Sequence, residues 1–158
     1  MTATFKVPIP SNHNVGPEDS QKMKRSQFLQ DLIKQLSPTL DSTTYVYCTV
    51  ARAKYGELEK LKPIVSIAEL EGLTLVIPLE QAKAEGLDYY RVFRRITLEG
   101  HSSLETLGLT SVVTSLLAER GITTNVIAGF YHDHMFVPSD RIDEAMEALK
   151  QLASHPEG

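Results

Sequence analysis

The sequence lacks a second cysteine, since Cys48 is the only one among its 158 residues. One cysteine excludes an internal disulfide framework and favours a reducing compartment, so we expect a cytoplasmic protein. Long apolar runs are also missing, and none approaches the roughly 18 residues that a membrane helix needs. Residues 1–10 have neither the basic start nor the apolar stretch of a secretory signal. We therefore expect no membrane partner.

An excess of basic residues is absent as well. Sixteen Lys and Arg residues stand against twenty Asp and Glu residues, which gives a formal net charge of −4. Proteins that bind the phosphate backbone normally carry a basic excess, so we expect no nucleic-acid partner. The sequence contains no P-loop, no Gly-x-Gly-x-x-Gly and no Gly-x-Ser-x-Gly motif. We predict no cofactor and no catalytic residue, because these patterns would signal phosphate binding or a serine nucleophile.

The first half begins with a segment unlike the rest of the chain. Residues 1–19 hold three prolines and a glycine among polar residues, which predicts a flexible N-terminal arm. Apolar residues at three- and four-residue steps then predict a helix over 20–36, with Pro38 as its end. Alternating and β-branched runs predict the remaining elements of this half, which are a strand over 45–50, a hairpin of strands 64–70 and 73–77, and a short helix over 80–84.

The second half reads as strand, helix, hairpin and helix. A strand over 89–98 is followed by the capping-box pattern Ser102-Ser103-Leu104-Glu105 and by a helix that Gly121 ends. A hairpin of strands 122–130 and 134–137 follows, and Ser139 or Asp140 is expected to cap the last helix. This β-α-β-β-α order is that of a ferredoxin-like module, and we predict the α+β class, with antiparallel sheet and helices packed on one face.

The start of the predicted helix after Ser102 is one candidate site. Backbone N–H groups at a helix N-terminus attract a carboxylate or a phosphate, although a plain helix cap explains the serines equally well. We expect Gly108 inside that helix, where glycine costs about 1 kcal/mol relative to alanine and so indicates close approach of a strand or a ligand. Asn125 falls in an apolar strand, where its amide needs a partner from neighbouring backbone or from a ligand.

A second candidate is the pair His132 and His134. In an unbroken strand both imidazoles would point to one face, where they would hold zinc with His101 as a third ligand. The alternative is that residues 131–133 form the hairpin turn. We favour the turn and predict no metal site, because a His-x-His pair alone is a weak signal.

Several of these motifs together carry a family resemblance over about residues 26–153. They are 45–49, 71–76, 101–104 with 108–110, 125–129, and 131–134 with 136–138. In these segments the sequence resembles a family of small tandem ACT-like domain proteins, and its second half is similar to the ACT module of amino-acid sensors. The resemblance implies two ferredoxin-like ACT-type modules, which we place at 20–88 and 89–158.

The resemblance also implies a function and a site. ACT domains are regulatory modules that bind amino acids or similar small ligands, usually at an interface between two modules. Carried over to this chain, the ligand-binding candidates are His101, Ser102, Ser103, Leu104, Gly108, Asn125, Val126 and Ile127, with His132 and His134 beside them. One departure is that no fourth strand follows Leu152, so the first half or a second chain must supply it.

The leading hypothesis is therefore a non-enzymatic regulatory protein that binds a small ligand, an amino acid, and forms a homodimer. One alternative is an interaction module that forms a homo-oligomer through an exposed sheet edge without any ligand. Another is a metal-dependent enzyme that uses His132 and His134.

Overall fold

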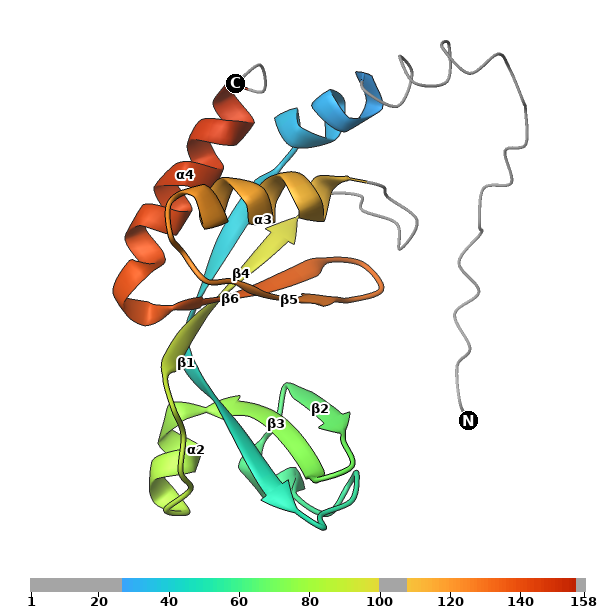
Figure 1. Ribbon diagram of the computed structural model, residues 1–158, viewed down its shortest axis with the longest axis vertical. Helices are drawn as coiled ribbons and strands as arrows, with labels where there is room; N and C mark the ends of the chain where they lie inside the picture. Colours follow the sequence, from blue (N-terminus) through green and yellow to red (C-terminus); the bar gives the residue numbers. More distant parts are fainter. Residues whose placement is uncertain (1–26, 100–107, 156–158) are drawn as a thin grey trace, which may run out of the picture.

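The computed structural model describes residues 27–99 and 108–155. The predicted arm over 1–19 and the candidates His101, Ser102, Ser103 and Leu104 lie outside the described residues. The elements in chain order are a helix over 27–34, β1 (Ser37–Ala51), η1 (Glu59–Leu61), β2 (Val65–Ala68), β3 (Gly72–Pro78), α2 (Leu79–Ala84), β4 (Val92–Glu99), α3 (Leu109–Glu119), β5 (Asn125–Ala128), β6 (Asp133–Pro138), η2 (Ser139–Arg141) and α4 (Ile142–Ser154) (Figure 1).

The strands form one six-stranded antiparallel sheet in the order β2-β3-β1-β4-β6-β5. The central strands β1 and β4 serve both halves of it. Residues 45–51 of β1 pair with β3, whereas residues 37–40 and 44–46 pair with β4. β4 in turn pairs with β6 on its other side. The first half therefore supplies the strand that was expected to be missing after Leu152.

β1 is much longer than the predicted strand over 45–50. It starts at Ser37, contains Pro38 opposite Leu98, and shifts register between Leu40 and Thr44. Proline is tolerated there because, among the described strands, this part of β1 pairs only with β4. The sequence between the proline and Thr44 shows no alternation, and pairing with β4 is what extends it.

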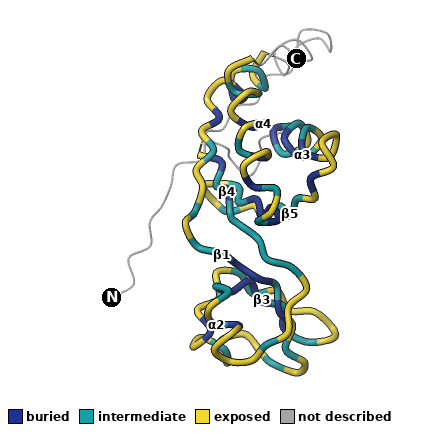
Figure 2. The backbone as a smooth tube through the Cα atoms, turned by 90° about the vertical axis from the view of Figure 1, so that its left-hand side faces the viewer, coloured by how far each residue is buried: buried dark blue, intermediate teal, exposed yellow. Residues whose placement is uncertain are grey.

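The described α-helices pack on one face of the sheet, as predicted. Val92, Ile96 and Leu98 alternate along β4 and so share a face. Val92 packs against the apolar cluster that contains Ala82 of α2, and the other two belong to the cluster that contains Val113 of α3. Both helices contain buried residues, which are coloured dark blue in Figure 2. The α+β class with antiparallel sheet is confirmed.

The opposite face carries aromatic side chains. Tyr45 and Phe136 are buried there, and Tyr47 lies edge-on against both Phe93 and Phe136, with ring centroids 5.2 and 5.8 Å apart. Among the described helices none packs on this face. The aromatic rings themselves therefore cover the central strands.

Two predictions about helix starts are wrong. Gly108 is not inside a helix but is the N-cap residue of α3, and the predicted cap Ser102 lies outside the described residues. Ser139 and Asp140 form the 3-10 turn η2, and the N-cap of α4 is Arg141, without a side-chain cap bond. Both helices therefore start later in the sequence than the predicted capping residues. Gly121 does adopt the left-handed conformation that was expected at the end of α3, with φ 65°.

Candidate functional site

The first turn of α3 is the part of the predicted site that the structure describes. Gly108 has φ 103°, a conformation that favours glycine, and its carbonyl oxygen accepts the Val112 N–H at 3.0 Å. A Cβ at Gly108 would lie 3.3 Å from Cδ2 of Leu29. The close approach that Gly108 indicates is therefore made by the helix over 27–34, and not by a strand.

A carboxylate lies beside this turn. The Thr110 hydroxyl donates a hydrogen bond to Oδ2 of Asp133, at 3.3 Å. Asp133 is the first residue of β6 and pairs with Ala128 and Leu98. A negative charge near the first turn of a helix is favoured by the helix dipole. Sequence reasoning missed this contact, because Asp133 was expected only as a turn residue.

The β5 candidates are divided between the two faces of the sheet. Val126 pairs with Met135 and packs against the cluster that contains Val113 of α3. Ile127 pairs with His134 and packs in the aromatic cluster on the opposite face. Asn125 is exposed at the start of the strand. The expectation that its amide needs a buried partner is wrong, because water can solvate it.

His132 and His134 have different environments. The Gly129 N–H donates to the His132 carbonyl oxygen at 2.9 Å, so residues 129–132 form the hairpin turn, and His132 lies in it. His134 lies in β6, and its Nδ1 is 3.0 Å from Oγ1 of Thr97. A turn at this place was predicted, but it covers residues 129–132 rather than 131–133, because Asp133 already pairs as the first residue of β6. No group of three His, Cys, Asp or Glu side chains able to hold a metal occurs in the described ranges 27–99 and 108–155.

Burial and charge make His134 harder to protonate. Burial lowers the pKa of its imidazole, and the positive charges of Arg95 and His132 lower it further, against an opposing effect of Asp133. A neutral ring accepts or donates at Nδ1 according to its tautomer, so either role toward Thr97 is open to it. His134 therefore stays uncharged at neutral pH.

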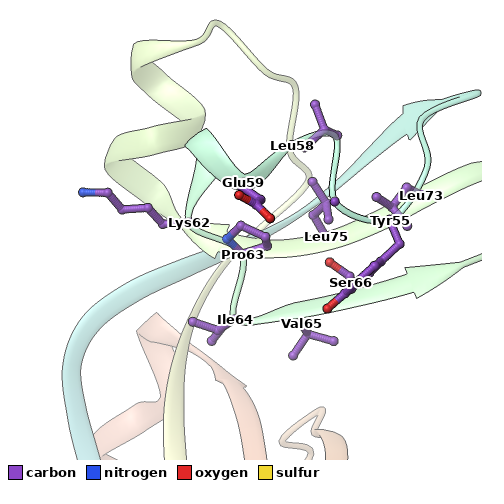
Figure 3. Close-up of a pocket in the computed structure, with 11 residues that line it drawn as sticks. Tyr55, Leu58, Glu59, Lys62, Pro63, Ile64, Val65, Ser66, Leu73 and Leu75 are labelled. Carbon is purple, nitrogen blue, oxygen red and sulfur yellow. The ribbon is translucent and has the colours of Figure 1, made fainter. Parts of the chain in front are cut away.

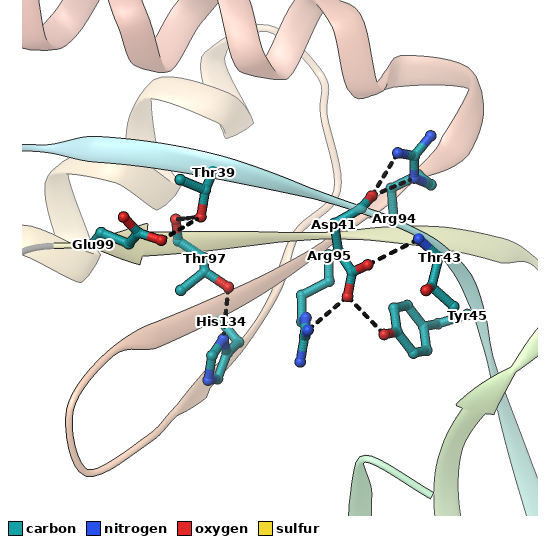
Figure 4. A network of polar contacts seen from close by, with 9 residues as sticks. All are labelled: Thr39, Asp41, Thr43, Tyr45, Arg94, Arg95, Thr97, Glu99 and His134. Atoms are coloured by element: carbon teal, nitrogen blue, oxygen red, sulfur yellow. Dashed lines mark hydrogen bonds and ion pairs between the residues drawn. The ribbon is translucent and has the colours of Figure 1, made fainter. Parts of the chain in front are cut away.

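A polar network lies at the irregular part of β1, where the two halves of the sheet join (Figure 4). The Asp41 carboxylate accepts hydrogen bonds from the Thr43 N–H at 2.9 Å, the Tyr45 hydroxyl at 2.7 Å and Arg95 at 2.6 Å. Arg94 donates to the Asp41 carbonyl oxygen, at 2.5 Å from its Nη2. Neighbouring arginines on β4, which point to opposite faces, thus both bind Asp41. Nothing in the sequence pattern predicted this network.

These hydrogen bonds decide how Asp41 titrates. Burial by itself would raise the pKa of the carboxyl, but the Thr43 N–H, the Tyr45 hydroxyl and the Arg95 charge outweigh it and lower the pKa below its usual value. The Asp41 carboxylate is satisfied within the network, whereas Nε of Arg95 is buried without a hydrogen-bond partner among the described residues. The three hydrogen bonds to the carboxylate give the network a structural role, and the start of α3 remains the candidate ligand site.

Comparison with known families gives two matches along the chain. The ACT domain family matches residues 26–94 and, separately, residues 89–151. The chain is a tandem ACT-domain protein. The two matches overlap at 89–94, which includes the start of β4, the strand that both halves of this tandem ACT-domain protein use.

Solved structures support the same fold for this ACT-domain protein. A protein of unknown function from Vibrio cholerae, described as a possible transport protein, is 42% identical, with a TM-score of 0.75 over 82% of this chain and 98% of that one. A protein from Agrobacterium tumefaciens is 15% identical, with a TM-score of 0.61 over 75% and 89% of the two chains. The ligand-free regulatory subunit of aspartate kinase from Thermus thermophilus is 12% identical, with a TM-score of 0.53 over 72% and 94%. The last two show the fold alone.

Comparison with curated proteins gives no match. ACT domains are regulatory rather than catalytic modules, so the tandem ACT domains support a regulatory, ligand-binding type of protein. None of the helices in the described ranges has the length and hydropathy to span a membrane.

Proposed function

We propose that this protein is a non-enzymatic regulatory protein that binds an amino acid at the start of α3. The observation that carries the proposal is the contact between Thr110 and Asp133. The first N–H groups of an α-helix have no partner within the helix and attract the α-carboxylate of a ligand. The Asp133 carboxylate beside them suits the α-ammonium group. One turn thus offers complementary groups to both charges of a zwitterion.

The same place lies where the two ACT matches meet. Leu29 belongs to the first match and Gly108 to the second, and their contact joins the helix over 27–34 to α3. A ligand that contacted both would stabilise one arrangement of the two modules over another, which is what a regulatory signal requires. The candidates His101, Ser102, Ser103 and Leu104 precede this turn in the sequence, separated from Gly108 by residues 105–107. We further propose that the working form is a cytoplasmic homodimer.

A thermal-shift screen of the twenty amino acids, followed by calorimetric titration, tests the proposal. Binding to the folded state raises the melting temperature, and the rise grows with the logarithm of the ratio of ligand concentration to Kd. We expect at least one amino acid to do so, and Asp133→Asn to weaken its binding about tenfold through loss of a charged hydrogen bond. Asp143→Asn, an exposed carboxylate on α4, is the matched control. Absence of any shift at about 10 mM of each amino acid would refute the proposal.

The edge strands favour a second function, that of an interaction module. β2 reads Val-Ser-Ile-Ala and β5 reads Asn-Val-Ile-Ala, so neither contains a charge or a proline. Natural edge strands usually carry such residues to prevent pairing with another chain. This function predicts a dimer that forms without ligand and is disrupted by Ile127→Lys. Light scattering with and without amino acids tests it, since a monomer under both conditions would exclude it.

A further inference from the structure

The two halves of the sheet are covered differently on the face that carries the helices. In the second half the eleven-residue helix α3 packs there, with Val113 and Leu117 in the same cluster as Met135 of β6. In the first half the segment between β1 and β2 forms only the three-residue η1, whose buried residue is Leu61. In the first half a loop therefore covers β2 and β3, whereas in the second half the helix α3 covers the corresponding strands.

This difference leaves a cavity. A space of about 370 Å³ lies between the loop and the helix face of the β2–β3 hairpin (Figure 3). Aliphatic side chains, Leu58, Pro63, Leu73 and Leu75, form much of its wall. Pockets that bind small molecules fall within about 300–1,000 Å³ and have mainly apolar walls with a few polar groups. The cavity has the size of a site for a small ligand, and its wall combines aliphatic side chains with polar ones.

The polar groups around the cavity indicate the charge of that ligand. Glu59, Ser66 and the exposed Tyr55 contribute to its lining. Among the described residues, the Glu59 carboxylate forms no ion pair, whereas the neighbouring Lys60 pairs with Glu85. In Figure 3 the ammonium of Lys62 extends away from the other lining side chains. The charge that faces a ligand is therefore negative.

We propose that this cavity binds a small organic ammonium ion. The hydrocarbon part lies against Leu58, Leu73 and Leu75, which removes it from water. The ammonium group pairs with the Glu59 carboxylate, and the ring of Tyr55, which also lines the cavity, offers an aromatic face that attracts a cation. This site is separate from the start of α3 and takes a ligand that needs no carboxylate.

Titration of the isotope-labelled full-length chain, followed by amide NMR, tests the proposal with three probes of similar shape. They are 2-phenylethylamine, the neutral 2-phenylethanol and the anionic 3-phenylpropionate. We expect the amine to cause saturable shifts confined to residues 55–66 and 73–75. Glu59→Gln should raise its Kd about tenfold, to the level of the alcohol. Glu71→Gln, an exposed carboxylate in the nearby hairpin turn, should leave the Kd unchanged.

Ser66→Phe provides an independent check, because its ring would occupy the cavity; binding of the amine should then be lost while the rest of the amide spectrum is retained. Equal binding of all three probes, an amine Kd that Glu59→Gln does not change, or shifts located elsewhere would each overturn the proposal. Asp133→Asn should not affect the amine. Failure of the amino-acid site and failure of this one are thus distinguishable.

Discussion

Nη2 of Arg95 lies 2.6 Å from Oδ2 of Asp41, although 54 positions separate the two residues in sequence. The side chains are only 28% and 18% exposed, and Arg95 also lies over the Tyr45 ring at 5.6 Å. The pair spans the register shift of β1, where that strand passes from one half of the sheet to the other. It therefore links β1 to β4 at the place where the two ACT domains share their central strands.

Removing the charge of Asp41 should destabilise the fold. Asp41→Asn leaves the guanidinium of Arg95 partly buried without its counter-ion, and we expect a loss of about 2 kcal/mol in the free energy of unfolding. Urea denaturation measures it. Asp88→Asn is the control, since Asp88 is exposed and forms no ion pair among the described residues. Equal stability of the two variants would contradict a role for the pair.

Loss of the hydroxyl group should lower the stability of the protein at Tyr45 but not at Tyr47, the other tyrosine of β1. The Tyr45 hydroxyl donates to Asp41 at 2.7 Å, so Tyr45→Phe should cost about 1 kcal/mol. The Tyr47 hydroxyl is buried without a partner among the described residues, and burial raises its pKa to about 12. Tyr47→Phe removes an unsatisfied polar group, and we expect it to be neutral or stabilising in thermal unfolding. A loss for Tyr47→Phe as large as that for Tyr45→Phe would show that Tyr47 has a partner.

Gly108→Ala should cost about 1–2 kcal/mol, because φ 103° strains any residue with a Cβ and that Cβ would press on Leu29. Gly121→Ala isolates the backbone part, since Gly121 has φ 65° and open space around it. The excess cost at Gly108 should shrink in a Leu29→Ala background. Chemical denaturation of Gly108→Ala, Gly121→Ala, Leu29→Ala and the double variant of Gly108 and Leu29 measures these costs. If Leu29→Ala did not reduce the excess cost of Gly108→Ala, the contact with Leu29 would not be its cause.

Stability should fall as the pH is lowered through the range in which His134 titrates. The folded-state pKa lies below the unfolded value near 6.5, so the unfolded chain binds more protons at that pH. The stability that this shift contributes is present above the unfolded pKa and is lost as the pH falls through the folded one. Unfolding measured between pH 7.5 and 5 should show this loss in the wild type. His134→Gln should show a smaller loss, whereas replacing the exposed His155 by Gln should leave it unchanged.

Local patterns predicted most of the elements. β3, β6 and α4 lie within a few residues of their predicted bounds, because alternating or helical apolar residues such as Leu75, Met135 and Leu149 are buried in the structure as the pattern requires. The first part of β1 escaped prediction. It has no such pattern, and it forms a strand because it pairs with β4, which lies nearly sixty positions away in the sequence.

The candidate site was predicted less well. The turn at His132 follows from local turn chemistry, whereas the position of Gly108 depends on Leu29, and the partner of Thr110 is 23 positions away. Contacts between residues so far apart in the sequence produce no periodic pattern from which a single sequence could predict them. Glu59 was missed for a related reason, because only the absence of a helix above β2 and β3 makes its surroundings a cavity.

The amino-acid sequence by itself determined the class of fold, the order of its elements and the kinship with ACT domains, because period, turn residues and short motifs are properties of neighbouring positions. Only the tertiary structure decided that β1 and β4 are shared by both halves, and that Asp133 stands at the first turn of α3. Those facts come from distant segments that burial and hydrogen bonding bring together. The free energy of these long-range contacts depends on the complete sheet, so no single stretch of the sequence determines it.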